Sequence, residues 1–147
     1  MAKTGVFPVS ASDWEIDIKY GTGTAEFVKI ADMESASISI DSGVENWTPL
    51  EAGGWQRSML TAKALTLNMS GKRNFGDQGN DFVANTLNKL GQDAMTRAKC
   101  TFPNGDTFEF NAVISLGDFV GADSTNVSPL SFDLVSDGEP VYTVATE

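Results

Sequence analysis

Hydrophobic and polar residues alternate along most of this 147-residue chain, which is the pattern of β-strands with one buried face. WEIDIKY places Trp14, Ile16 and Ile18 on one side and charged residues on the other. The same period of two recurs in ESASISI, LTLNM, MTRAKCTF, TFEFNAVISL and SPLSFDLV. Asn104-Gly105 adds the sequence signal of a tight β-hairpin. We therefore expect one mainly β domain over residues 1–147, a β-sandwich or partly closed barrel.

One segment, DQGNDFVANTLNKLGQD, departs from this alternation and predicts a flanking α-helix over about residues 80–90. Asn80 or Asp81 would cap its N-terminus, and Gly91 is placed to end it. The apolar spacing gives the helix one buried face, made of Phe82, Val83, Thr86, Leu87 and Leu90.

Residues 41–59 (DSGVENWTPLEAGGWQRSM) break the alternation, because Pro49 and Gly53-Gly54 interrupt regular elements. We expect a long loop here, and loops of more than about 12–15 residues are usually functional or disordered. Trp47 and Trp55 make disorder a poor explanation, as do the apolar residues Val44, Leu50 and Met59. Either the loop folds back on its own domain, or it is an arm whose aromatic residues dock on a neighbouring subunit.

The strand faces that point away from the predicted core carry short polar side chains. Solvent-facing strands usually mix long lysine and glutamate side chains, partly to prevent edge pairing. This composition has two explanations. Either it is chance variation among acceptable surface residues, or these faces form a smooth, hydrophilic, slightly acidic surface. The residues are Ser37, Ser39, Thr66, Asn68, Glu109, Asn111, Ser115, Ser131 and Asp133.

Composition narrows the function. The chain has no histidine and one cysteine, which argues against zinc or copper sites and against the commonest acid–base catalysis. Twenty acidic against ten basic residues give a net charge of −10, which disfavours binding to nucleic-acid phosphates or anionic membranes. No apolar run is long enough to span a membrane, and the N-terminus lacks a secretory signal. We expect a protein that folds in a cytoplasm, is not an enzyme and needs no cofactor or metal.

Several segments, in this order, resemble the major tail tube proteins of long-tailed bacteriophages over nearly the whole chain. They are GGWQRS, LTLNMSGKR, DQGND followed by a helix, FPNGD, FNAVISLGDF and SFDLVSDGEP. These proteins are related in fold to the tube proteins of contractile tails and type VI secretion systems. The resemblance implies six subunits that join their inner sheets into a barrel around a lumen, and rings that stack into a hollow tube.

The resemblance also implies partners and contacts. DNA would pass through the lumen without specific binding, past the polar residues given above. Tape measure and tail terminator or initiator proteins would be the other partners, in a virion tail assembled in the host cytoplasm. The N-terminal arm (residues 1–13) and residues 41–59 would reach neighbouring rings or subunits. Candidate contact residues are Phe7, Val44, Trp47, Leu50, Trp55, Arg57, Lys72, Arg73 and Asp77.

Two other interpretations remain at this stage. Trp47 and Trp55 could form a stacking platform in a carbohydrate- or ligand-binding β-sandwich module. Such a module could hold Ca²⁺ at GDQGND, although Asp77 and Asp81 do not match the spacing of an EF-hand loop. A different structural protein, such as a tail terminator or a pilus-like subunit, is the second alternative.

Overall fold

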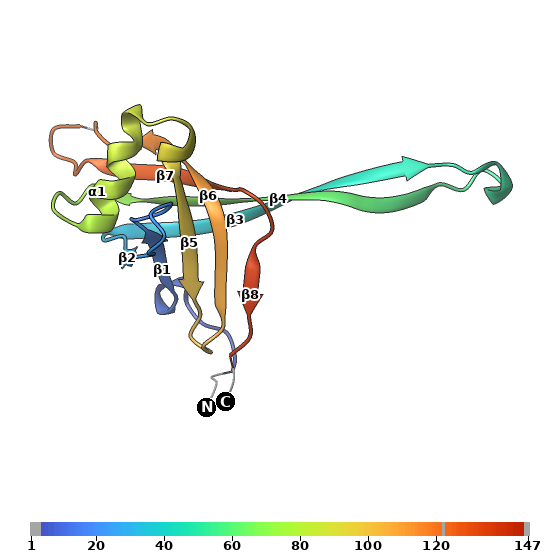
Figure 1. Ribbon diagram of the computed structural model, residues 1–147, viewed down its shortest axis with the longest axis horizontal. Helices are drawn as coiled ribbons and strands as arrows, with labels where there is room; N and C mark the ends of the chain where they lie inside the picture. Colours follow the sequence, from blue (N-terminus) through green and yellow to red (C-terminus); the bar gives the residue numbers. More distant parts are fainter. Residues whose placement is uncertain (1–3, 122, 146–147) are drawn as a thin grey trace.

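The computed structural model describes residues 4–121 and 123–145. Within these residues eight strands form one antiparallel sheet that does not close on itself, with a helix packed against it (Figure 1). This confirms the predicted mainly β fold with a flanking helix. The strand order is β2-β1-β5-β6-β7-β4-β3, and β8 pairs with β6. The strands are β1 (Asp13–Asp17), β2 (Phe27–Lys29), β3 (Met33–Trp47), β4 (Arg57–Lys72), β5 (Met95–Thr101), β6 (Thr107–Asp118), β7 (Pro129–Ser136) and β8 (Val141–Thr143).

The core lies on the face of the sheet that the alternation predicted. In β5 and β7 every second residue is buried, because neighbouring side chains of a strand point to opposite faces. Leu67, Phe110 and Phe132 are among the largest fully buried side chains. At the predicted hairpin the Phe102 N–H donates to the Asp106 carbonyl, and Gly105 supplies a positive φ of 97°. The position of this β5–β6 turn is confirmed.

Helix α1 (Gln78–Ala84) is followed directly by the 3₁₀ helix η3 (Asn85–Asn88), and a second 3₁₀ helix, η4 (Gly91–Ala94), leads into β5. The predicted capping residues were wrong. Asp77 is the N-cap, and its carboxylate accepts from the Asn80 N–H at 3.0 Å. Asp81 lies in the first turn of the helix, where its negative charge is stabilised by the positive end of the helix dipole. No helix within the described residues is long and apolar enough to cross a membrane.

The predicted buried face of this helical segment is correct at its start and wrong at its end. Val83 and Thr86 are buried, but Leu87 and Leu90 are exposed. The α-helical turn stops at Ala84, and the tighter 3₁₀ turn that follows changes the direction of the later side chains.

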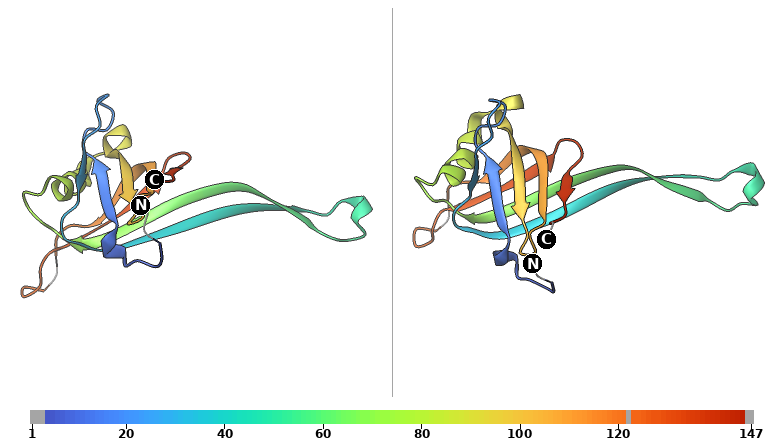
Figure 2. Two further views of the ribbon diagram at one scale, coloured as in Figure 1. Left: turned by 90° about the horizontal axis from the view of Figure 1, so that it is seen from below. Right: turned by 60° about the horizontal axis from the view of Figure 1, so that its bottom comes forward.

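Residues 41–59 are not the irregular loop that was expected. They continue β3 and β4 as a two-stranded antiparallel arm, paired from Asp41–Ala64 to Trp47–Arg57. A turn containing the 3₁₀ helix η2 (Leu50–Ala52) joins the strands. The arm projects away from the body of the molecule (Figures 1 and 2). The alternation of apolar and polar residues is absent here, because it arises where one face of a strand packs on a core. No residue from 41 to 64 is buried.

Candidate functional site: assembly surfaces

The nine predicted polar residues lie together on the face of the sheet opposite the core. The strand register aligns them in rows across β3, β4, β7 and β6. One row contains Ser37, Asn68, Asp133 and Ser115, each directly opposite the next. Side chains of directly paired residues share a face, so the register gathers these polar residues on one surface. Val135 and Val113, which are paired with each other, lie on the same surface between the polar rows.

This polar face also includes two basic residues of β5, Arg97 and Lys99. The alternation predicted this strand, but its outward-facing side chains were not included in the predicted polar face. Arg97 is opposite Asn111 and donates to its Oδ1 at 2.8 Å and to Glu109 Oε2 at 3.1 Å. Asn68 Nδ2 donates to Asp133 Oδ1. The side chains bond one another across the strands, and the guanidinium is paired with a carboxylate. The Arg97 guanidinium is therefore not free to bind a phosphate, and the Lys99 ammonium lies over the Phe27 ring at 5.4 Å.

The arm is rich in exposed apolar side chains. Leu50 in the turn is fully exposed and Trp55 is 79% exposed. Val44 lies opposite Leu60 in the ladder, and both are exposed. An isolated two-stranded hairpin is marginally stable in water, and clustered exposed apolar residues indicate an interaction surface. The arm thus has the character of a segment that packs on another molecule.

The tip of the arm, residues 49–55, is ordered by its own backbone. The Ala52 N–H donates to the Pro49 carbonyl and the Trp55 N–H to the Ala52 carbonyl, both at 3.2 Å. Gly53 and Gly54 adopt φ values of 63° and 91°, which side-chain-bearing residues rarely adopt. Arg57 lies over the Trp47 ring at 5.8 Å and forms a cation–π contact. The tip presents its apolar groups in a defined arrangement.

Arg73 and Asp77, two of the candidate contact residues, are bonded within their own chain. Arg73 Nη1 donates to Asp81 Oδ1 at 2.7 Å and to Asn80 Oδ1 at 2.9 Å. Asp77 accepts from the Ala31 and Asn80 N–H groups. Lys72 forms a surface ion pair with Glu34 at 3.2 Å, which contributes little stability.

Asn80 is the centre of this network and is fully buried. Its Oδ1 accepts from Arg73 and from the Asn74 N–H, and its Nδ2 donates to the Ala31 and Lys72 carbonyls. The four bonds join α1 to the chain before β3, to the last residue of β4 and to the two residues that follow it. Next to it, a Cβ on Gly79 would lie 2.4 Å from the Lys29 carbonyl oxygen, so glycine lets the helix approach β2. This network fixes the helix behind the glycine-rich loop.

Phe75 is a candidate contact residue that the sequence interpretation missed. It is 80% exposed, yet the Arg73 guanidinium lies 4.2 Å from its ring centroid and holds it in place. A hollow of about 300 Å³ beside it is lined by Leu87, Phe119 and Val120, among others. A single aromatic residue in an otherwise polar, glycine-rich loop was the available sequence signal.

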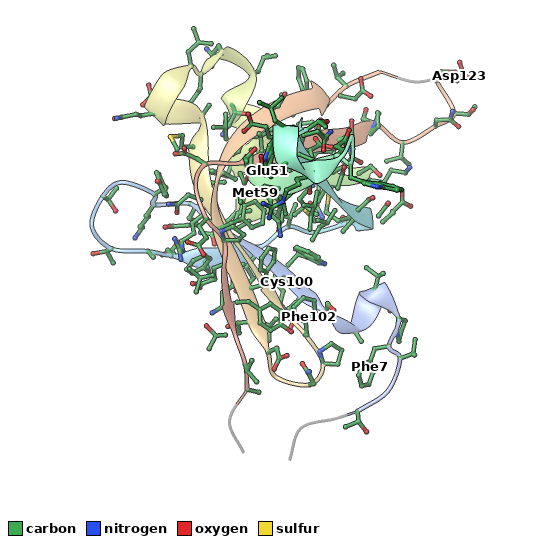
Figure 3. The ribbon with its side chains drawn as sticks, turned by 90° about the vertical axis from the view of Figure 1, so that its right-hand side faces the viewer. Phe7, Glu51, Met59, Cys100, Phe102 and Asp123 are labelled. Carbon is green, nitrogen blue, oxygen red and sulfur yellow. The ribbon has the colours of Figure 1, made fainter. Side chains whose placement is uncertain are left out.

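Phe7 lies against its own domain. It lines a groove of about 620 Å³ with Trp14, Ile38, Phe102 and Tyr142, which we call the N-terminal groove. Figure 3 shows Phe7 and Phe102 on the same side of the body, beneath the arm. Of the predicted arm over residues 1–13, residues 1–3 lie outside the described residues, and β1 already begins at Asp13.

Asp106 holds the C-terminal strand β8 beside this groove. It accepts from the Tyr142 hydroxyl at 2.6 Å and from the Ala145 N–H at 2.7 Å. The bond from Ala145, followed by that from Tyr142, lowers the pKa of the Asp106 carboxyl below its ordinary value. The same contact with Asp106 raises the pKa of Tyr142. The ionised carboxylate therefore fastens the strand.

We expect β8 to be released in acid. Because the folded-state pKa of Asp106 is lowered, its stabilising effect is complete above the ordinary carboxyl pKa of about 4 and is lost as the pH falls through the lower folded value. The protection of the amides of residues 141–145 against hydrogen exchange, measured relative to the intrinsic rate at each pH, should fall below about pH 4. In Asp106→Ala the same amides should have low protection at every pH, and wild-type protection in that variant would contradict the assignment.

The lone cysteine and the carboxylates of GDQGND, the other residues that could carry chemistry, are buried or bonded within the fold. Cys100 is fully buried, and burial raises its pKa to about 12. In GDQGND the Asp81 carboxylate accepts from Arg73 and the Gly76 N–H. Over residues 4–121 and 123–145, no group of three or more acidic, histidine or cysteine side chains could hold a metal ion.

No protein-family model matches the sequence, and no curated protein is significantly similar to it. Solved structures with the same fold do exist. A chain from the tail of an empty GTA particle, refined with C6 symmetry, is 19% identical with a TM-score of 0.72, over 95% of this chain and 100% of the other. A chain from the virion of a native gene transfer agent (GTA) particle is 14% identical with a TM-score of 0.73, again over 95% of this chain and 100% of the other. A chain from the tube-terminating cap of the anti-feeding prophage is 14% identical with a TM-score of 0.62, over 99% of this chain and 95% of the other.

Proposed function

We propose that the protein is a structural subunit of a bacteriophage-type tail tube and not an enzyme. The observation that carries this proposal is the arm, a two-stranded extension without buried residues whose apolar side chains need a partner. The fold match to chains from a C6-symmetric tail supports it. The position of Trp47 and Trp55 also favours a tube subunit over a ligand-binding module. Both lie on the projecting arm, and not in a pocket of the body.

In this proposal six copies form a ring, and rings stack into a hollow tube in a virion tail. The polar face lines the lumen. Its short side chains and its paired Arg97 would let DNA slide past on ejection, since free basic groups would bind phosphates and retain it. Tape measure and terminator or initiator proteins would be the other partners of the tube. Assembly would take place in the host cytoplasm, as in long-tailed phages.

Electron microscopy of the purified subunit over a salt series tests the proposal. We expect hollow tubes of uniform width, with more assembly in moderate salt than in low salt. The reason is that a net charge of −10 makes subunits repel one another, and salt screens this repulsion over about 10 Å at 0.1 M. Assembly that weakens on adding moderate salt would contradict this electrostatic account. Persistent monomers at high protein concentration in all salts would contradict the proposed function.

A further inference from the structure

The hollow beside Phe75 has the features of a prepared binding site. We call it the distal hollow and define it by Phe75, Leu87, Phe119 and Val120. Phe75, Leu87 and Val120 are each well exposed, and they come from three different segments. Exposed apolar residues that gather in this way mark interaction surfaces.

The position of Phe75 is fixed before any partner binds. Its ring lies on the guanidinium of Arg73, whose side chain is 8% exposed and bonded to both Asn80 and Asp81. A buried network thus orders an exposed aromatic side chain. Ordering an anchor in advance reduces the entropy lost on binding.

The distal hollow and the arm tip lie at opposite ends of the molecule. Helix α1 and the loop of residues 119–128 (apart from residue 122) lie at the end of the body away from the arm in every view (Figures 1 and 2). A contact between two different patches on identical subunits is head-to-tail and can repeat without limit. Stacking of rings requires a contact of this type.

The chemistry of the tip matches that of the hollow. The tip offers the exposed side chains of Leu50 and Trp55 to an apolar surface. Its acidic residue, Glu51, is next to Leu50, and the basic Lys89 directly follows Asn88, which lines the hollow. Opposite charges beside an apolar contact favour one orientation of docking.

We propose that the distal hollow receives the arm tip of a second copy of this chain in the neighbouring ring, with Phe75 as its anchor. This contact rests on the proposed tube function, and it specifies where the arm binds. Six such contacts in each ring act together, so that individually weak docking gives stable stacking.

Disulfide trapping tests the contact. A mixture of Leu50→Cys and Leu87→Cys subunits is assembled and oxidised, and disulfide-linked dimers are measured on a non-reducing gel. The native Cys100 is buried and protonated at neutral pH, so it does not interfere. We expect linked dimers in the assembled mixture at a level at least about tenfold above that of a Leu50→Cys and Val9→Cys mixture, which probes the N-terminal groove instead.

A second variant tests the anchor. Phe75→Ala should raise the protein concentration needed for stacking by about tenfold or more, as loss of a central aromatic anchor does. Val113→Ala, which truncates an exposed residue of β6, should leave this concentration unchanged. Because Phe75 is mostly exposed, folding of the free subunit should be unaffected.

The outcomes separate the two proposals. Tubes in which the tip links to Val9→Cys, or to neither position, overturn the docking site and leave the tube function intact. Tubes that form equally well with Phe75→Ala overturn the role of the anchor. A wild-type protein that never forms rings or tubes overturns the tube function, and the contact with it.

Discussion

Replacing residues 43–62 with an Asn-Gly turn between Ser42 and Lys63 is expected to abolish tube formation and to leave the body folded. Ser42 and Lys63 are directly paired in the ladder, so a two-residue turn can close the shortened hairpin at this point. No residue in the deleted segment is buried, and the core therefore keeps all its side chains. The arm is needed for contacts with other subunits and not for folding.

Two measurements check this expectation. Urea unfolding should give a free energy within about 1 kcal/mol of the wild-type value, because surface changes away from the core have small effects. Electron microscopy should show no stacked tubes at concentrations at which wild type assembles. A full-length control with Gln56→Ala, an exposed position on the arm, should still assemble. Normal tubes from the shortened chain would exclude the arm as an assembly element.

Asn80→Ala is expected to destabilise the folded subunit by about 2–4 kcal/mol, because it leaves three partly buried backbone groups without partners. The carbonyls of Ala31 and Lys72 lose their donor, and the Asn74 N–H loses its acceptor. Arg73 keeps its bond to Asp81 but loses the one to Asn80. The free energy of unfolding in urea measures the effect.

Asn85→Ala is the matched control, since Asn85 lies in the same helical segment and is exposed. It should change the unfolding free energy by less than about 0.5 kcal/mol. A loss below about 1 kcal/mol in Asn80→Ala would mean that water or rearranged side chains replace the four bonds. The role given to Asn80 in fixing the helix would then be wrong.

The period of two determined which residues form the core strands, because each of these strands buries one face against the rest of the domain. Ile16, Leu67 and Phe110 were read directly from this alternation, and all are buried. The same pattern determined the opposite, polar face, whose members share a surface once the strands pair in register. Asn104-Gly105 determined a turn through local backbone preference alone.

Tertiary structure decided what the alternation could not record. The arm has no core to bury its side chains, so its strands carry no clean period, and their mutual backbone pairing defines them. The partners of Arg73 and Asn80 come from segments distant in the sequence or from a folded loop, and neither charge nor spacing reveals them. For the same reason, Phe75 becomes a candidate anchor when the fold places Arg73 beneath its ring and leaves its other face exposed.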